Sequence, residues 1–308
     1  MSGFRAILIA GPTASGKSAA ALELAGTLNG VVINADSKQV YRDLRVLSAR
    51  PSAEEEARVP HALYGFVPSA DAYSVGRWLE DVGGAVSDAE AQGKTPIIAG
   101  GTGLYFKALL EGLSPVPDIP EAVRAHWRET AGETSAEALH AMLQDRDPET
   151  AGQLRPSDPQ RIVRALEVLD ATGRSLAQWQ KEAGAPVLRE AETARFFITR
   201  PREELYARIN ARFDAMLSSG AVEEVEALAA QKLDPDLPVM RAHGVKPLMG
   251  LLSGSFTQEE AVERVKTDTR RYAKRQETWA KSNMISWNRI EKKESESFAS
   301  NIFSFIDV

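Results

Sequence analysis

The 308-residue sequence contains no cysteine, which excludes disulfide bonds, thiolate metal sites and a cysteine nucleophile. It has four histidines, and no two of them are spaced as in a zinc-binding motif. No apolar run approaches the ~20 residues needed to span a bilayer. The first residues lead directly into an apolar strand pattern and leave no room for a signal peptide. We therefore expect a cytoplasmic protein that does not bind a membrane.

The composition is that of an ordinary globular protein, with 43% hydrophobic and 26% charged residues. A chain of this length allows roughly two domains and a large buried core. The net charge of −6 argues against nonspecific binding of a polyanion by the whole surface, although it allows a local basic face. Nothing in the sequence requires an oligomer, so we expect a monomer.

The most informative stretch is Gly11-Pro12-Thr13-Ala14-Ser15-Gly16-Lys17-Ser18, which fits the pattern G-x-x-x-x-G-K-[S/T] of a phosphate-binding loop. It follows the apolar run Ala6–Ala10 and opens an alanine-rich helical pattern, which is the setting that the motif needs. Its glycines let several N–H groups point inward, and the helix N-terminus adds partial positive charge. Lys17 adds a full charge, and the Ser18 hydroxyl can bind Mg²⁺. The motif predicts that this loop holds a phosphorylated ligand.

Short apolar runs that alternate with helical patterns predict an α/β fold, with a parallel sheet covered by helices on both faces. The expected elements are strand Phe4–Ala10, helix Lys17–Leu28, strand Val31–Ala35, helix Val75–Gln92, strand Thr95–Ala99 and strand Arg195–Thr199. Long helical patterns follow the last strand to about Ser282. The sequence therefore predicts a P-loop core built from two separate parts of the chain.

The pattern changes near Ser114–Pro120, where three prolines in six residues break helix and strand alike. From Glu121 to about Lys181 the periodicity is helical, with no convincing strand. We expect a P-loop α/β core of residues 1–118 and 190–290, an all-helical insertion domain of residues 119–189, and a tail of residues 291–308. The tail begins with a polar stretch, and from Phe298 onward it is apolar enough to dock on another part of the protein.

Two polar residues, Asp36 and Thr102, come directly after expected strands. Because parallel strands end at one edge of a sheet, both should face the crevice of the phosphate loop. Asp36 fits a magnesium ligand, a general base or a helix N-cap, and its position does not choose among them. The glycines around Thr102 allow close approach to a ligand or simply form a tight turn. Neither Ile97–Ala99 nor Phe196–Thr199 ends in the magnesium-holding Asp of a nucleoside triphosphatase, which weakens that interpretation.

Two pairs of arginines share a helix face. Arg161 and Arg164 lie three residues apart on the polar side of an expected helix, which is more often a solvated face than a binding face. Arg208 and Arg212 lie four residues apart, and their guanidinium groups suit diphosphate oxygens. Pairing with carboxylates such as Glu204 is an equally good interpretation of the second pair.

The strongest charge asymmetry lies in Arg264–Lys281, which has seven basic and two acidic residues. On a helix, Val265, Tyr272 and Trp279 form a packing stripe, and the cations form a basic ridge that suits a phosphate backbone. The ridge consists of Arg264, Arg270, Arg271, Lys274, Arg275 and Lys281, of which we expect Arg271, Lys274 and Arg275 to contact RNA. Surface solubility is the alternative role of the ridge.

Six dispersed motifs together resemble those of the bacterial tRNA dimethylallyltransferases. They are Gly11–Ser18, Asp36–Tyr41, Gly100–Tyr105, Asp158–Val168, Arg241–Pro247 and Lys274–Trp279. The resemblance runs in order from about residue 4 to residue 282, and it is far more specific than the phosphate loop alone. It implies transfer of a dimethylallyl group from dimethylallyl diphosphate to the N6 amine of the adenosine 3′-adjacent to a tRNA anticodon, with Mg²⁺ as cofactor.

The resemblance also implies roles for single residues. The phosphate loop would hold the diphosphate of the donor, Arg208 or Arg212 would grip it, and Ser18 would bind Mg²⁺. Asp36 would be the general base, and Thr102 would contact the donor and the reacting centre. Contacts with the tRNA anticodon stem-loop are implied for Asp36, Ser37, Lys38, Gln39, Arg124, Gln160, Arg161, Ile162, Val163, Arg164, Arg241, Ala242, His243, Gly244, Val245 and Lys246.

Two departures from the family pattern stand out. Ser157 precedes Asp158 where asparagine is common, and Val245 follows Gly244 where an aromatic residue is expected to stack. Two other functions stay open from the residues alone. A P-loop small-molecule or nucleoside kinase would turn over ATP without any need for tRNA, and a noncatalytic RNA-binding protein would use the basic ridge alone.

Overall fold

The computed structural model describes residues 3–182, 184–291 and 298–306. The chain forms two compact units. Met1–Leu110 and Val187–Val308 make up the core unit, and Glu111–Pro186 make up the helical unit. The helical unit thus begins and ends a few residues before the insertion expected at 119–189. Of the expected tail, residues 292–297 and 307–308 lie outside the described residues.

The core unit is built on a six-stranded sheet whose neighbouring strands all run parallel. The strands are β1 (Ala6–Ala10), β2 (Gly30–Asn34), β3 (His61–Ala62), β4 (Thr95–Gly100), β5 (Thr193–Thr199) and β6 (Asn288–Glu291). Their order is β3-β2-β4-β1-β5-β6, so strands from before and after the helical unit meet in the centre. The predicted α/β fold with a parallel sheet is confirmed, and β3 and β6 are additions that the sequence did not predict.

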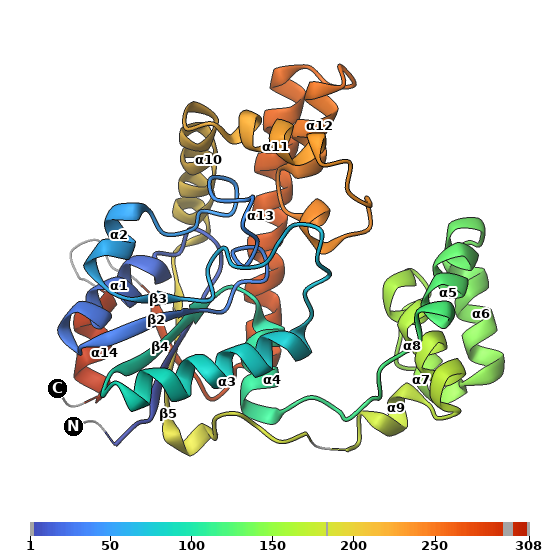
Figure 1. Ribbon diagram of the computed structural model, residues 1–308, viewed down its shortest axis with the longest axis horizontal. Coiled ribbons are helices and arrows are strands. Elements are labelled where there is room, and N and C mark those ends of the chain that lie inside the picture. Colours follow the sequence, from blue (N-terminus) through green and yellow to red (C-terminus); the bar gives the residue numbers. More distant parts are fainter. Residues whose placement is uncertain (1–2, 183, 292–297, 307–308) are drawn as a thin grey trace. The chain divides into compact units, whose positions relative to one another are not determined.

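Helices cover both faces of the sheet because its central strands are apolar on both sides. Along β1, Leu8 belongs to one buried cluster, whereas Ile7 and Ile9 belong to another. Helices α1 (Lys17–Thr27) and α14 (Phe298–Ile306) lie side by side and pack against the second cluster (Figure 1). The described part of the expected apolar tail therefore docks on the core unit as α14, as its composition predicts.

The core unit has further helices before and after the helical unit. They are α2 (Ala53–Arg58), α3 (Val75–Ala91), α4 (Gly103–Glu111), α10 (Arg202–Ser218), α11 (Ala221–Ala230), α12 (Val245–Leu252) and α13 (Gln258–Asn283), with short 3₁₀ turns η1 (Glu190–Glu192) and η2 (Pro238–Arg241). Among the described residues, we find no helix with both the length and the apolarity that crossing a membrane needs.

The helical unit has a small core of its own. Its helices are α5 (Glu121–Glu133), α6 (Ala136–Arg146), α7 (Pro148–Ala151), α8 (Pro159–Thr172) and α9 (Leu176–Trp179). Trp127, Leu139, Leu143 and Leu166 pack together between these helices. Helix α8 begins as the sequence predicts, with the Asp158 side chain accepting a hydrogen bond at the N-terminus and proline in the first turn.

Three loops leave the carboxyl ends of β1, β2 and β4 at the same edge of the sheet, because these strands are parallel. Backbone hydrogen bonds join the last two of these loops. The N–H of Ala35 donates to the carbonyl oxygen of Ala99 (2.9 Å), and the N–H of Thr102 donates to that of Ala35 (3.2 Å). This edge therefore brings the phosphate loop, the Asp36 segment and the Thr102 turn together.

Candidate active site

The phosphate loop Gly11–Ser18 has the backbone of an anion-binding turn. Ala14 and Gly16 both have positive φ angles, 63° and 103°, and α1 begins at Lys17, directly after them. Positive φ is uncommon for a residue with a side chain, and it recurs where a loop clamps a ligand. The helix N-terminus and its free N–H groups therefore face the inside of the loop, where they favour a phosphate group.

Three cationic side chains converge on this loop. Arg208 Nε, from α10, donates a hydrogen bond to the carbonyl oxygen of Ala14 at 3.0 Å. Burial lowers the pKa of Lys17 to about 8, although the carboxylate of Asp36 raises it, and Arg212 lowers it further. Burial, together with Arg208, also lowers the pKa of Arg212. Like charges held together at a partly buried place indicate a site for an anion.

Pairing of Arg208 and Arg212 with glutamates, the alternative interpretation, is wrong. In the described part of the chain neither arginine makes an ion pair, and Glu204 pairs with Arg200 instead. Arg200 is 8% exposed, and its Nε donates to the carbonyl oxygen of Ser15 at 2.8 Å. Sequence reasoning missed Arg200, which holds the phosphate loop from the end of β5.

A cavity of about 590 Å³ lies over the phosphate loop, and we call it the cationic cavity. Its lining includes Thr13, Ala14, Gly16, Lys17, Ser18, Asp36, Gln39, Arg45, Arg50, Arg208 and Arg212. Gly11, Pro12 and Ser15, the other members of the loop motif, are buried. The volume and the charge of this cavity fit a diphosphate group.

A side-chain amide from α13 joins the phosphate loop to the turn after β4. Gln276 Oε1 accepts a hydrogen bond from the N–H of Thr13 (3.0 Å), and its Nε2 donates to the carbonyl oxygen of Gly101 (2.8 Å). A Cβ at residue 101 would lie 2.3 Å from Gln276 Nε2, so a larger residue there would displace this amide from its position between the two loops. Gln276 lies within the motif Lys274–Trp279, and the sequence alone gave no indication of its role.

Asp36 has one carboxylate oxygen occupied and one open. Oδ1 accepts a hydrogen bond from the N–H of Lys38 (2.9 Å), and the backbone N–H of Asp36 donates to Oδ1 of the fully buried Asn34 (2.8 Å). Oδ2 lies 3.4 Å from the position of a Cβ on Gly101, and no described residue donates to it. The chain after Asp36 forms turns rather than a helix, so the N-cap interpretation is wrong.

Thr102 links the segments that follow β2 and β4. Its Oγ1 accepts a hydrogen bond from the backbone N–H of Ser37 at 2.9 Å. The neighbouring glycines make room for protein atoms, because a Cβ on Gly100 would lie 2.0 Å from the Ala35 carbonyl oxygen and one on Gly103 would lie 2.3 Å from the Trp279 ring. Tight packing therefore explains Gly100 and Gly103. Gly101 and Gly103 also line a cavity of about 230 Å³, so the structure fits both interpretations of these glycines.

A second cavity, of about 300 Å³, shares Thr13, Asp36 and Arg212 with the cationic cavity. Its walls include the rings of His243 and Tyr272, whose centroids are 4.4 Å apart. Burial lowers the pKa of His243 to about 4, so its imidazole is neutral near pH 7. Burial, with Asp36, raises the pKa of Tyr272. We call this space the ring cavity, since uncharged rings line it and Asp36 stands where the two cavities meet.

The predicted RNA-contact residues after Asp36 are partly used inside the protein. Ser37, Lys38 and Gln39 are all partly exposed. Lys38 Nζ donates to the carbonyl oxygen of Pro238 (2.7 Å), and burial lowers its pKa to about 8. Gln39 Nε2 donates to the carbonyl oxygen of Ala49 (2.8 Å). These side chains organise the edge of the site as well as lining it.

Within Arg241–Lys246 the two end residues are exposed, whereas Ala242, Gly244 and Val245 are buried. Ala242 and Val245 belong to the main core cluster. Gly244 has a φ of +98°, and a Cβ there would lie 2.8 Å from Leu47. Their side-chain positions face protein, so an RNA contact at these three residues would have to be made by the backbone.

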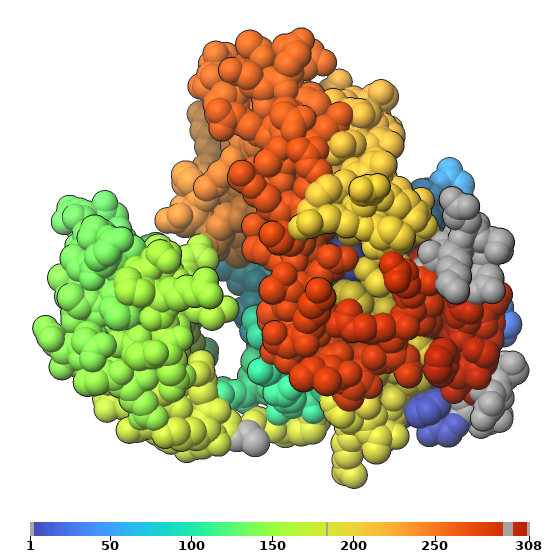
Figure 2. Space-filling view, turned by 180° about the vertical axis from the view of Figure 1, so that it is seen from behind, coloured from blue at the N-terminus to red at the C-terminus, as the bar shows by residue number. Residues whose placement is uncertain are grey.

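The basic ridge on α13 is narrower than predicted. Arg270 turns toward the protein, where it donates to Asn210 (2.9 Å) and pairs with Glu263 (2.7 Å). Arg264 lies over the ring of Phe256, 4.1 Å from its centroid. The exposed cations of the ridge are Arg264, Arg271, Lys274, Arg275 and Lys281. Figure 2 shows the side of the core unit on which α13 reaches the surface beside α10.

In the helical unit, the predicted RNA-contact residues are exposed or partly exposed with one exception. Arg124, Gln160, Arg161, Val163 and Arg164 reach the surface of this unit. Ile162 is fully buried in the core of the unit, which corrects the expectation that its side chain contacts RNA. The side chain of Arg161 is 73% exposed although it lies 3.5 Å from the Asp158 carboxylate.

The oxygen ligands near the phosphate loop fit Mg²⁺ bound together with a phosphate ligand. In the described ranges, no cluster of three or more His, Asp or Glu side chains could hold a metal ion unaided. The exposed Ser18 hydroxyl and the Asp36 carboxylate line the same cationic cavity. Mg²⁺ prefers oxygen ligands and often binds through one or two protein groups, with substrate phosphates and waters completing its shell.

Comparison with known proteins gives concordant matches. The family model described as IPP transferase matches residues 39–283, and that described as isopentenyl transferase matches residues 4–60. A tRNA dimethylallyltransferase of Methylocella silvestris is 55% identical over 296 residues, which are 96% of this chain and 98% of the relative. The tRNA isopentenylpyrophosphate transferase of Bacillus halodurans has a similar structure (TM-score 0.69, 31% identity, 98% and 94% covered). So does a eukaryotic dimethylallyltransferase acting on tRNA (TM-score 0.78, 28% identity, 94% and 74% covered).

Proposed function

Because the chain belongs to the IPP transferase family, it is a transferase that adds a prenyl group to tRNA, and we propose how its residues do so. The donor in this proposal is dimethylallyl diphosphate, and the acceptor is the N6 amine of the adenosine 3′-adjacent to the anticodon. One observation carries the proposal: Lys17, Arg208 and Arg212 converge on the phosphate loop beside the open oxygen of Asp36. Because one chain supplies all of these groups, we propose that the monomer is active. We also propose that it acts in the cytoplasm.

The cationic cavity is the proposed place of the donor's diphosphate. The phosphate loop, Lys17 and the two arginines already line this cavity, so their positive charge is in place before charge develops on the leaving group. Preorganised donors of this kind are usually the largest contribution to catalysis. Ser18, with the diphosphate oxygens, would hold Mg²⁺, which would share the negative charge of the leaving group.

Asp36 is the proposed general base. The adenine amine is a poor nucleophile because its lone pair is delocalised into the ring, and it needs an acceptor for its proton as the new bond forms. The N6 lone pair forms a bond to C1 of the prenyl group while the C1–O bond breaks, and that electron pair leaves with diphosphate. The N6 proton passes to Oδ2 of Asp36. The Thr102 hydroxyl, which accepts a hydrogen bond from the backbone N–H of Ser37, would contact the donor at the same place.

The ring cavity is the proposed place of the adenine. Enzymes that act on a base atom take the base out of its stack, and anticodon loops present single-stranded bases that can be turned out. The uncharged rings of His243 and Tyr272 would face the base, and Asp36 would meet its amine. For the tRNA backbone we propose the exposed cations Arg241, Lys246, Arg271, Lys274 and Arg275 of the core unit, with Arg124, Gln160, Arg161 and Arg164 of the helical unit.

Incubation of the protein with labelled dimethylallyl diphosphate and unmodified tRNA tests the proposal. Label should enter tRNA only when both substrates and Mg²⁺ are present, at the adenosine beside the anticodon. ATP turnover without tRNA would instead support the kinase interpretation.

The role of Asp36 is tested by Asp36→Asn, which keeps the shape and removes the base. Transfer should fall by about 10²–10⁴-fold, the usual contribution of a general base, while tRNA affinity changes little. Asp88→Asn, at an exposed position on α3, is the matched control and should be fully active. Wild-type turnover by Asp36→Asn would remove Asp36 as the base.

A further inference from the structure

A loop outside the regular elements forms a wall of both cavities, and we call residues 44–50 the wall loop. Leu47, Ser48 and Ala49 line the ring cavity. Arg45, Val46, Ser48, Ala49 and Arg50 line the cationic cavity. The conformation of this loop therefore sets the shape of both proposed substrate sites.

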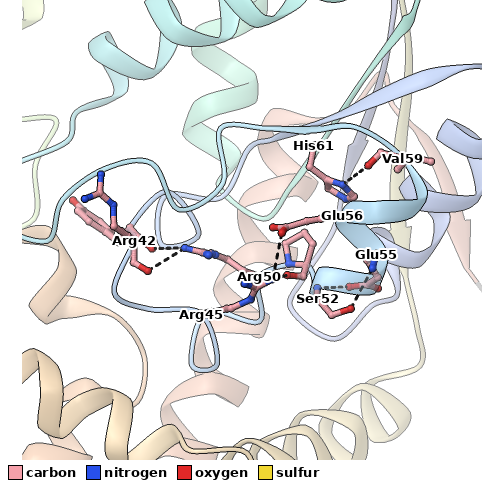
Figure 3. Close-up of polar contacts among 10 residues, drawn as sticks. Arg42, Arg45, Arg50, Ser52, Glu55, Glu56, Val59 and His61 are labelled. Atoms are coloured by element: carbon pink, nitrogen blue, oxygen red, sulfur yellow. Dashed lines mark hydrogen bonds and ion pairs between the residues drawn. The ribbon is translucent and has the colours of Figure 1, made fainter.

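The carbonyl groups in and next to the wall loop are bound by side chains from nearby in the sequence. Gln39 Nε2 donates to the carbonyl oxygens of Ser48 and Ala49 at 2.9 and 2.8 Å. The guanidinium of Arg50 donates to the carbonyl oxygens of Tyr41 and Arg42, each at 3.1 Å (Figure 3). These contacts fix the loop to itself, but they do not fix it to the helices on the other side of the cavities.

A distant carboxylate binds the amide groups of the same loop. Glu224, on α11, accepts hydrogen bonds from three successive N–H groups, those of Arg45 (2.5 Å), Val46 (2.8 Å) and Leu47 (2.9 Å). Successive N–H groups that converge on one point form an anion-binding concavity, and hydrogen bonds to a charged acceptor are the strong ones. The wall loop thus has an anion site of its own, which Glu224 fills from 177 to 179 residues away in the sequence.

The contacts of Leu47 extend the effect of Glu224 to another part of the site. Leu47 packs against Gly244, where any Cβ would lie 2.8 Å from its methyl group. Gly244 directly follows His243, whose ring lines the ring cavity. The backbone N–H of Leu47 is one of the three that Glu224 binds. The Glu224 carboxylate therefore holds Leu47 in place, and through Leu47 it keeps the wall loop packed against the Arg241–Lys246 segment.

We propose that Glu224 is a positioning residue for the transfer reaction. Its carboxylate attaches the wall loop to α11 of the core unit and so sets the affinity for both substrates. The effect on substrate affinity rests on the proposed function, whereas the attachment of the wall loop by Glu224 does not depend on it. Without the carboxylate, three N–H groups lose their partner and the loop moves away from the cavities. The reacting groups themselves, Asp36 and the phosphate loop, stay in place.

Amide hydrogen exchange of the full-length, ligand-free protein measures the attachment directly. In Glu224→Gln and Glu224→Ala, exchange at residues 45–47 should be about 10–100-fold faster than in the wild type, as expected for the loss of hydrogen bonds that hold a loop. Glu226, exposed on the same helix, supplies the control variants Glu226→Gln and Glu226→Ala, which should exchange as the wild type does. Wild-type exchange in the Glu224 variants would overturn the proposal.

Steady-state kinetics separates positioning from a general loss of structure. In the Glu224 variants, KM for dimethylallyl diphosphate and for tRNA should rise about tenfold with a much smaller change in kcat, because the lost interaction acts in ground state and transition state alike. If the substitutions only reduced the fraction of folded, active enzyme, the apparent kcat would fall and KM would stay unchanged. That result would overturn the proposal.

Chemical rescue completes the test. In Glu224→Ala the anion site of the loop is open, so added acetate should slow exchange at residues 45–47 and lower KM, whereas chloride at the same ionic strength should do neither. Absence of rescue, together with faster exchange throughout β1, would show a structural role and overturn the proposal.

The exchange measurement and its rescue by acetate need no substrate. A wild-type protein that transfers no prenyl group would therefore refute the proposed function and leave the attachment of the loop to be judged separately.

Discussion

Arg208 Nε lies 3.0 Å from the carbonyl oxygen of Ala14, so a hydrogen bond joins α10 to the phosphate loop across 194 residues of sequence. One side of the guanidinium is thus committed to the loop. Its other N–H groups remain for a ligand in the cationic cavity, which Arg208 also lines. A single side chain therefore holds the loop and presents charge to the proposed diphosphate.

This double use makes Arg208 sensitive to a conservative change. Arg208→Lys keeps the charge but loses the planar fork, so it cannot serve loop and ligand together. We expect KM for dimethylallyl diphosphate to rise about tenfold or more, as for the loss of one charge-assisted hydrogen bond. Arg202→Lys, an exposed change on the same helix, is the control and should behave as the wild type. Equal KM values for the two variants would contradict the proposed contact.

Gln276 gives a second test, because its amide binds Thr13 and Gly101 at once. Gln276→Glu keeps the acceptor for the N–H of Thr13. It replaces the donor to the Gly101 carbonyl oxygen by a carboxylate oxygen, so that two acceptors face each other, and it adds negative charge near the diphosphate. We expect kcat/KM to fall by about 10²-fold, since displacements of ~1 Å at a reacting centre have effects of that size. The measurement is steady-state transfer, with Gln258→Ala at the exposed start of α13 as control. Full activity of Gln276→Glu would show that the two loops keep their positions without this bridge.

Much of the sheet edge could be predicted because its signals are local. The phosphate loop is a contiguous motif between an apolar strand and a helix, and it needs no information from elsewhere in the chain. Asp36 and Thr102 each follow a strand that is buried on both faces. Since parallel strands end at the same edge, their proximity follows from topology alone. That argument gives a place in the fold and leaves the role of each residue undecided.

The elements that sequence reasoning missed have weak local signals. In β6 three of four residues are exposed and only Ile290 is buried, because this strand lies at the edge of the sheet. Strand β3, at the opposite edge, has two residues. Neither shows the run of apolar residues that marks a central strand.

The missed contacts depend on tertiary structure. Arg200 reaches Ser15 across 185 residues, and Gln276 reaches Thr13 across 263. The error on α13 has the same origin, since a helical pattern tells which side a residue occupies but not what lies opposite. Asn210 and Glu263 take up Arg270, and no periodicity in α13 could have indicated the partner on α10.

The lowered pKa of Lys17 predicts a pH effect on donor binding. With a pKa of about 8, the amine is about half protonated at pH 8 in the free protein, and a bound diphosphate favours the charged form. Binding of dimethylallyl diphosphate should therefore take up about half a proton at pH 8 and almost none at pH 6.5. Affinity should fall as pH rises through 8, because binding must then pay for protonation.

Calorimetry in buffers of different ionisation enthalpy measures this proton uptake. Lys17→Met should abolish the uptake at pH 8 and weaken binding at every pH. Lys38 also has its pKa lowered to about 8, but it bonds to Pro238 and lines the ring cavity. Lys38→Met should therefore keep the proton uptake. Loss of the uptake in Lys38→Met would show that Lys38, and not Lys17, is the group that takes up the proton.

The exposed part of the basic ridge predicts a change in the salt dependence of tRNA binding. Arg271 and Lys274 are exposed on α13, and the side chain of Arg271 is 70% exposed although Asp268 lies 3.7 Å away. If each contacts a phosphate, the double variant Arg271→Glu with Lys274→Glu should bind tRNA more weakly, and its plot of log affinity against log salt should flatten by about 1.5, since each lost contact removes about 0.7–0.9. Lys232→Glu, an exposed charge reversal elsewhere in the core unit, should leave that slope unchanged. Weaker binding with an unchanged slope would mean that the two cations act through the fold of α13 rather than on the RNA backbone.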